Sequence, residues 1–284
     1  MRHLFKIVIL AFILHLTPST LHSTPSTLHP TPSILNSQFS ILNSQFSTQV
    51  RLGLQTSAGY GTFIEGGAGP MLFHGLEMAS QLSLQVEYPE WLWSVDLMIP
   101  TGAYAYRVEL TTPCAYGLMP QLQLKALKRV KESNNWEFHA GAGVNELFDL
   151  RYITPLGNSG VGTSNFISLI LLAKETFTTG RWSFHAELGF VPLSIATRPG
   201  FSYMANYDRS LSEYVSTHFS GHQWYVTWAN ALHTETGATL LLHNGNRIGL
   251  TYRWNYLTSK ISDNAPHRFD HASHLLQLSF LFAL

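Results

Sequence analysis

Asp270, His271 and Ser273 are the residues whose types and spacing come nearest to catalytic chemistry. A carboxylate beside an imidazole can act as a general acid–base pair, and an imidazole near a hydroxyl can generate a nucleophile. The residues that follow have the pattern of a β-strand, and adjacent residues of a strand point to opposite faces. Asp270 and His271 therefore cannot both face one interior once the strand has begun. We predict no catalytic, cofactor-binding or metal-binding residue here or elsewhere in the sequence.

A second set of polar side chains recurs at alternate positions of segments that are otherwise apolar. Isolated charges in a narrow interior are costly, so we expect carboxylates and arginines to pair. The two arginines of the set are Arg247 and Arg253. Their expected partners are Glu187, Glu235 or the polar face of the last strand (Gln277 and Ser279). We interpret the set as a structural polar network rather than a catalytic or ion-conducting site; its members are Glu137, His139, His185, Glu187, Glu235, Arg247 and Arg253. The same faces also carry Glu77, Glu87, Asp96 and Lys125.

The elements that must position these residues are β-strands. Apolar residues alternate with polar or small ones through most of the sequence after residue 48, most regularly over 247–256, and a period of two indicates strands. Phe166 to Glu175 is apolar on both faces, which leaves its assignment open. We predict ten strands, near residues 50–60, 71–88, 91–100, 116–129, 136–150, 164–177, 181–196, 222–243, 246–258 and 272–284.

Short and long connections between these strands alternate. The short ones are 89–90, 131–135, 178–180 and 244–245, and the last is an Asn-Gly hairpin signal. The long ones are 61–70, 101–115, 151–163, 197–221 and 259–271. This segregation is typical of an up-and-down barrel with short turns at one end and long loops at the other. The predicted fold class is all-β: a closed antiparallel barrel of about ten strands, with eight or twelve as the alternatives.

Composition favours a membrane barrel over its rival, a soluble barrel or sandwich. Only 12% of residues are Asp, Glu, Lys or Arg, whereas a soluble domain has about 25%. A soluble β-protein needs charge on its outer face, and the polar faces here are mostly Gly, Ser, Gln, Thr and His. The formal net charge of zero gives no reason to expect a nucleic-acid partner, and the single cysteine, Cys114, excludes an internal disulfide.

The first 48 residues are expected to lie outside the folded domain. A basic start followed by the apolar run Ile7 to Leu14 is typical of a secretory signal peptide, which we assign to 1–23. Residues 17–48 contain a seven-residue repeat, and its prolines forbid the coiled coil that this period would otherwise suggest. We predict that the repeat segment is disordered and that a β-barrel domain occupies 49–284.

The final strand carries a resemblance to a known class. Apolar residues stand at every second position, at Leu276, Leu278, Phe280, Phe282 and Leu284. This segment resembles the closing strand of bacterial outer-membrane β-barrel proteins, whose assembly machinery reads such a signal. That class usually ends in Phe or Trp, where this sequence has Leu284. The resemblance implies a bacterial outer-membrane location, contact with outer-membrane lipid and recognition by the barrel-assembly machinery.

The resemblance leaves three functions to compare. The first is a structural, adhesion or surface-recognition role through extracellular loops and an unknown extracellular ligand, since the loop at 197–221 is rich in tyrosine. A narrow porin for small solutes is the second. The third is a mouth-located hydrolase acting on lipid or peptide, which would resemble omptin proteases through Asp270-His271 or lipid A deacylases through His271-Ala272-Ser273. The deacylase pattern needs a downstream acidic residue, and none follows. We interpret the histidines near 218–222 and 267–274 as solvated loop residues.

Overall fold

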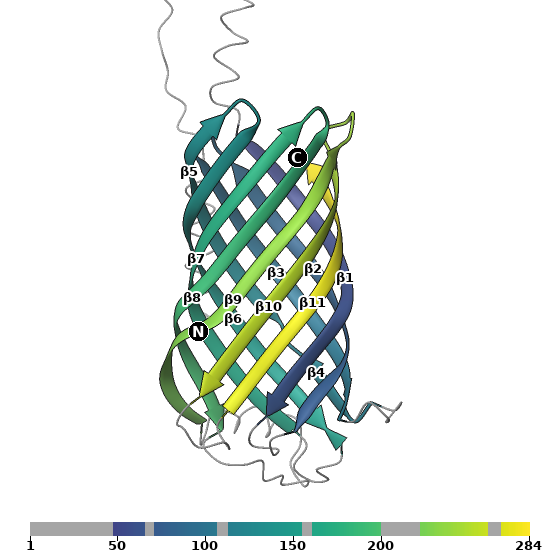
Figure 1. The fold of residues 1–284 in the computed structure, drawn as a ribbon, viewed down its shortest axis with the longest axis vertical. Helices are drawn as coiled ribbons and strands as arrows, with labels where there is room; N and C mark the ends of the chain where they lie inside the picture. Colours follow the sequence, from purple (N-terminus) through teal and green to yellow (C-terminus); the bar gives the residue numbers. More distant parts are fainter. Residues whose placement is uncertain (1–47, 66–70, 107–112, 155–160, 200–221, 261–267) are drawn as a thin grey trace, which may run out of the picture. The chain divides into compact units, whose positions relative to one another are not determined.

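The computed structural model describes residues 48–65, 71–106, 113–154, 161–199, 222–260 and 268–284; the predicted signal peptide and most of the repeat segment lie outside these ranges. Within them the chain is nearly all strand (Figure 1). No helix of the described residues is long and apolar enough to cross a membrane. The strands are β1 (Gln49–Glu65), β2 (Leu72–Glu87), β3 (Trp91–Ala105), β4 (Ala115–Leu118), β5 (Gln121–Ser133), β6 (Trp136–Ile153), β7 (Val161–Thr179), β8 (Trp182–Pro199), β9 (His222–Leu241), β10 (Arg247–Lys260) and β11 (Arg268–Ala283).

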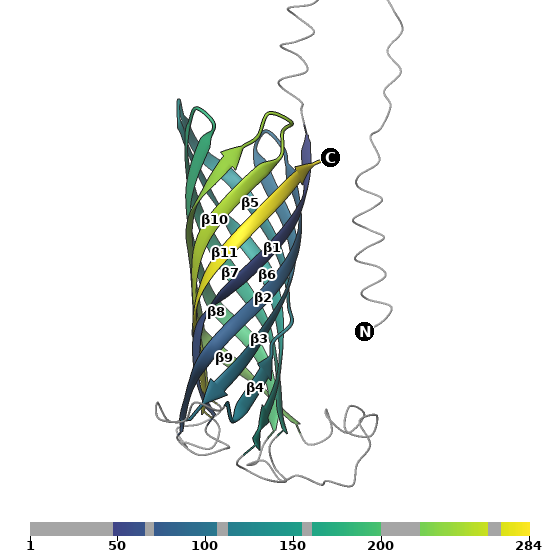
Figure 2. The ribbon, with the colours of Figure 1, turned by 90° about the vertical axis from the view of Figure 1, so that its right-hand side faces the viewer.

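The strands close into one antiparallel barrel. Apart from β4 and β5, which do not pair with each other, each strand pairs with its neighbours in the sequence, and β11 pairs back to β1 from Arg51–Ala283 to Glu65–Phe269. Figure 2 shows this seam, with β11 in yellow beside β1 in purple. Because β4 and β5 both lie between β3 and β6, they form one interrupted strand, and the described strands occupy ten positions around the barrel. The predicted fold class is confirmed.

Prolines account for two irregularities of the sheet. Pro120 separates β4 from β5, and Pro192 lies where the pairing of β8 with β9 shifts between Val191 and Leu193. Proline has no N–H to donate to the ladder, so it is confined to breaks and bulges of this kind. The turns after β7 and β9 contain Gly180 and Gly245 with φ of 57° and 83°, a left-handed conformation that glycine adopts without strain.

The apolar side chains face outward. In β11, Leu276 and Leu278 are 56% and 54% exposed, whereas Leu275 and Gln277, which point into the barrel, are only 2% and 4% exposed. Aromatic rings follow the turns, at Trp91, Trp93, Trp136, Phe138, Trp182 and Phe184, and a second group lies nearer the other end, at Tyr60, Tyr116, Tyr152, Tyr252 and Tyr256. Two aromatic belts flanking an aliphatic band are the expected surface of a barrel that crosses a bilayer.

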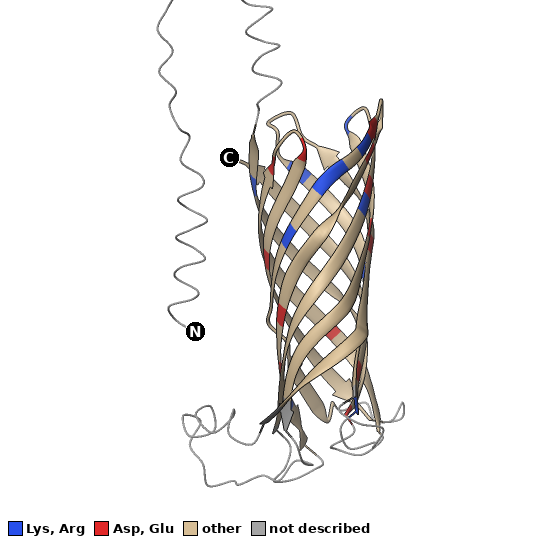
Figure 3. Ribbon diagram, turned by 90° about the vertical axis from the view of Figure 1, so that its left-hand side faces the viewer, with Lys and Arg blue, Asp and Glu red and all other residues tan. Residues whose placement is uncertain are grey.

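Connection length divides the barrel into a turn end and a loop end. The turn end holds the four short connections, which follow β2, β5, β7 and β9. The loop end holds the five long ones, whose central residues lie outside the described ranges. The predicted alternation of short and long connections is therefore confirmed. Most Lys and Arg residues visible in Figure 3 lie in the half of the barrel nearest the short turns.

The apolar character of both faces of Phe166–Glu175 has a physical explanation. It lies within β7, whose Ile167, Leu169 and Leu171 face outward at 40–47% exposure. Its inward residues Phe166, Ile170 and Leu172 are at most 4% exposed. The segment is apolar on both faces because the lumen contains an apolar layer at this level.

The outward band gives a testable expectation at Leu278, an outward-facing residue of β11 that is 54% exposed. Leu278→Arg should lower the free energy of unfolding by about 2–4 kcal/mol, the cost of a charge on the lipid face near the bilayer centre. Urea unfolding of the refolded protein in lipid vesicles, followed by tryptophan fluorescence, measures it. Leu278→Ala, which adds no charge, is the control, and equal losses in the two variants would contradict a lipid-facing position.

Candidate functional site

A layer of charged side chains crosses the lumen, and we call it the septum: Asp96, Lys125, Glu187, His233, Glu235 and Arg253. Glu187, Glu235 and Arg253 lie directly opposite one another on β8, β9 and β10. His233 lies two residues before Glu235 on the same face of β9, so its ring joins the same row. Strand register therefore places four of the six members side by side.

The other two members, Asp96 of β3 and Lys125 of β5, come from the opposite wall of the barrel. They connect that wall to the row formed by β8, β9 and β10. Lys125 of β5 reaches across the lumen, with its Nζ 2.8 Å from Glu187 Oε1 and 4.0 Å from Asp96 Oδ2. Arg253 lies 2.5 Å from Glu235 Oε1 through Nη2 and donates from Nη1 to Met98 Sδ of β3 at 2.8 Å. Because each of these charges is nearly enclosed and paired, the septum is a bridge between opposite walls of the barrel.

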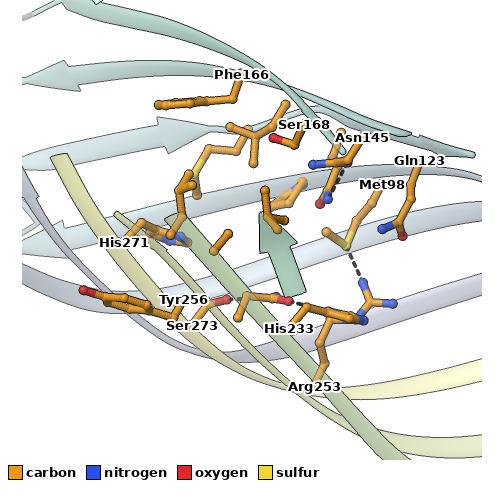
Figure 4. Close-up of a pocket in the computed structure, with 18 of the residues that line it drawn as sticks. Met98, Gln123, Asn145, Phe166, Ser168, His233, Arg253, Tyr256, His271 and Ser273 are labelled. Atoms are coloured by element: carbon orange, nitrogen blue, oxygen red, sulfur yellow. Dashed lines mark hydrogen bonds between the residues drawn. The ribbon is translucent and has the colours of Figure 1, made fainter. Parts of the chain in front are cut away.

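The septum separates two cavities. The turn-end cavity, of about 280 Å³, is polar and reaches Glu235. The inner chamber, of about 100 Å³, lies on the other side and reaches His233 and Arg253. Figure 4 shows these two side chains together at one part of the chamber, with His271 and Phe166 elsewhere on its lining. The apolar inward residues of β7, such as Phe166 and Ile170, line this chamber.

A second closed layer, which we call the mouth cluster, lies toward the loop end. Glu77 is fully buried, and its Oε1 accepts a hydrogen bond from the Tyr104 hydroxyl at 2.5 Å and lies 2.7 Å from His271 Nε2. The ring of Tyr104 occupies the space where a side chain at Gly102 would lie, so a glycine is needed for this inward packing. The three partners come from β2, β3 and β11.

Arg151 forms the centre of the same layer. It pairs with Glu65 at 2.5 Å and also with Asp149. Its guanidinium carbon lies 4.1 Å from the centre of the Phe269 ring and 5.6 Å from that of Phe63. Stacking over aromatic rings together with two carboxylate partners holds the arginine rigidly in the lumen.

The structure brings some of the predicted polar residues together and separates others. Glu187, Glu235 and Arg253 meet in the septum, with Glu235 as the partner of Arg253. Arg247 does not contact Glu187 or Glu235, its expected partners. It is the first residue of β10, next to the turn after β9 and far along the strand from Arg253, and it lies 3.5 Å from Glu87. The remaining predicted residues line the turn-end cavity without joining the septum; they are Glu137, His139 and His185.

Asp270 and His271 face opposite sides of the barrel wall, as strand alternation requires. Asp270 accepts a hydrogen bond from Thr258 at 2.6 Å and pairs with Arg268. His271 lies in the lumen with Glu77 and is 9% exposed, so the expectation that it is a solvated loop residue is wrong. The two side chains do not form an acid–base pair.

Several residues of both layers are absent from the predicted network. His233 could have been found, because the period-two rule that selects Glu235 also selects the residue two positions earlier. Arg151 lies beyond the predicted end of its strand at residue 150, whereas β6 continues to Ile153. Tyr104 was missed for the same reason, since β3 continues to Ala105.

The pairing across the septum predicts a large effect of Lys125→Met, which keeps the length of the side chain and removes its charge. Glu187 and Asp96 then remain buried without this partner, so the free energy of unfolding should fall by about 3–5 kcal/mol. Urea unfolding measures it. Adding Glu187→Gln should restore part of the loss, because the pair is coupled. Lys128→Met is the exposed control, with a change within about 0.5 kcal/mol; equal losses at Lys125 and Lys128 would contradict the bridge.

No protein-family model and no curated protein match the chain. Among solved structures it is similar to the outer membrane protease OmpT from Escherichia coli, at 6% identity over 84% of this chain and 96% of that one, with a TM-score of 0.46. It is also similar to the translocator domain of autotransporter NalP from Neisseria meningitidis, at 10% identity over 89% and 96% of the two chains, with a TM-score of 0.48. These likenesses are too distant to assign an activity.

The structure itself fits a bilayer. A sheet that closes on itself satisfies its own backbone hydrogen bonds, which the interior of a bilayer requires. Its outer surface is an aliphatic band between aromatic belts, and its charged side chains pair inside the lumen. The chain is a closed antiparallel β-barrel whose outer surface fits a lipid bilayer.

Proposed function

We propose that the protein is a closed, non-conducting barrel that holds its long connections at the cell surface, where they act in adhesion, recognition or envelope integrity. The observation that carries this proposal is the pair of layers across the lumen, the septum and the mouth cluster. A pore needs a continuous path for water, and here each layer crosses the lumen through a buried ion pair, Lys125 with Glu187 in the septum and Arg151 with Glu65 in the mouth cluster. Contact with outer-membrane lipid and assembly by the barrel-assembly machinery belong to the same proposal, with β11 as the strand that is recognised.

The energetics of the two layers support a closed lumen. An ion passing the septum would have to separate Lys125 from Glu187, which are 10% and 5% exposed. Breaking such a buried pair leaves uncompensated charge in a medium of low polarity. At the mouth cluster, it would also have to displace Arg151 from between aromatic rings. A narrow porin would need a lumen without these two barriers to the passage of ions.

The arrangement of the connections supports a role at the surface. The five long connections share one end of the barrel, and the four described turns at the other end are too short to form a binding surface. In bacterial outer-membrane barrels the long loops are extracellular. A hydrolase at Asp270 and His271 has no support, because the two side chains lie on opposite faces of the wall.

Planar-bilayer recording tests the closed lumen. The purified, refolded full chain should give no resolvable single-channel steps. Lys125→Ser with Glu187→Ser should remove the septum bridge, and Arg151→Ser with Glu65→Ser should remove the centre of the mouth cluster. Neither pair alone should conduct, because the other layer remains, whereas the fourfold variant should give steps.

Electrophoresis with and without boiling serves as the control for folding, since a closed barrel migrates differently when it is unfolded. Resolvable steps from the unaltered, heat-shifting protein would overturn the closed-lumen proposal and favour passage of small solutes. Silence of a folded fourfold variant would show that these two layers are not what closes the lumen.

Accessibility of inserted peptide tags tests the display of the loops. A tag inserted after Ser210, in the longest connection, should be labelled by antibody on intact cells. The same tag inserted between Asn244 and Gly245, in a short turn, should be labelled only after the outer membrane is permeabilised. The reverse pattern would contradict an extracellular loop end.

A further inference from the structure

Two carboxylates of the septum face each other across neighbouring strands. Glu187 of β8 and Glu235 of β9 are directly opposite in register, and both side chains are almost enclosed. Like charges in this position destabilise a sheet unless a cation lies between them or beside them. Lys125 and Arg253 each approach one of the two carboxylates. They do not account for the third member of the group, the ring of His233.

The His233 ring presents an acceptor to both carboxylates. Its Nδ1 lies 2.8 Å from Asn255 Oδ1, and the Asn255 amide is oriented by donating from Nδ2 to Ser273 Oγ at 3.3 Å. This network assigns the ring proton to Nδ1 and leaves a lone pair on Nε2. Nε2 lies 3.6 Å from Glu187 Oε1 and 3.4 Å from Glu235 Oε1, and it has no hydrogen-bond partner among the described residues.

The cations near the septum leave the three acceptors facing one another. Asp96, Glu187 and Glu235 supply three carboxylates, and Lys125 and Arg253 are the permanent cations paired with them. A third cation, Lys174 of β7, is directly opposite Glu187 in register and lines the turn-end cavity. A cation at the centre of the group would remove the contact between Glu187, His233 and Glu235.

From this geometry we propose that Glu187, His233 and Glu235 bind a first-row divalent transition-metal ion, for which Zn²⁺ is the reference. One ligand atom from each residue lies within 4.8 Å of the others, so a single ion can reach all three. An imidazole nitrogen with two carboxylate oxygens is a donor set that suits zinc and its neighbours. The proposal goes beyond the closed-lumen function and holds whether or not the barrel conducts.

The surroundings of the three ligands fit this role. Asn255 Oδ1 accepts a hydrogen bond from the other ring nitrogen, as the groups behind metal-bound histidines commonly do, so Asn255 is a positioning residue. Lys125 and Arg253 restrain the two carboxylates and reduce their mutual repulsion. The turn-end cavity reaches Glu235 and provides a polar route to the site. A bound ion would link β8 to β9 at the middle of the septum.

Isothermal titration calorimetry with Zn²⁺ on the refolded full chain in detergent tests the site. One saturable site per chain is expected. His233→Gln and Glu187→Gln should each weaken binding at least tenfold, and Asn255→Leu should weaken it roughly 10–100-fold without removing a ligand. His139→Gln is the matched control, because His139 lines the turn-end cavity away from the septum. It should bind as the unaltered chain does.

Co²⁺ gives an independent readout, since a site of four or five ligands that include His233 should produce visible absorption bands that His233→Gln abolishes. Binding should also weaken from pH 7.5 to pH 5, because protons compete for the imidazole nitrogen. Every variant must first show the heat-dependent gel shift. Absence of saturable binding to the unaltered chain would overturn the proposal. Equal weakening by His233→Gln and His139→Gln would also overturn it, since the chain has 14 histidines that can bind zinc nonspecifically.

Discussion

The closure of the sheet between β1 and β11 is the constraint on which the rest of the structure depends. In a bilayer, a backbone N–H or C=O without a partner costs several kcal/mol, so an open sheet edge is excluded. The pairing from Arg51–Ala283 to Glu65–Phe269 removes both edges at once. Closure with ten strand positions also fixes the width of the lumen, which is narrow enough for side chains from opposite walls to meet.

That narrowness explains the layered lumen. Lys125 of β5 can reach Glu187 of β8, with β6 and β7 between them, because the lumen is narrow at this level. Charges that can meet across the lumen pair there, as in the septum, and apolar side chains such as Ile170 line the inner chamber beside it. Aromatic rings around Arg151 fill the lumen again toward the loop end. The same dimension that makes the barrel stable therefore leaves little room for a pore.

Much of this fold was predictable from local sequence, because strand alternation and turn chemistry are local properties. The ten strands, the alternation of short and long connections and the outward face of Leu276 and Leu278 all follow from a period of two and from turn residues. The contact between Lys125 and Glu187 could not be predicted in this way. It depends on which strands lie opposite each other around the circumference, and that is set by the register of every hairpin between them.

The site was predictable only in part, for two separate reasons. Tyr104 and Arg151 lie where strands continue past the point at which sequence alternation becomes weak, so their inward orientation was not apparent. His233 lies inside a predicted strand, and strict use of the alternation would have included it. Its relation to Asn255 depends on the pairing of β9 with β10, which brings the two residues opposite each other.

The β1–β11 seam also sets an order of events for folding. Every other pairing of the described strands joins consecutive segments of chain, so each can form as a local hairpin with a small loss of chain entropy. The seam joins residues such as Gln55 and Gln277, which are 222 positions apart. Such a long-range pairing is the slowest to form. Until it forms, the chain is a curved sheet with two unpaired edges, and those edges are the sites at which this protein is most exposed to aggregation.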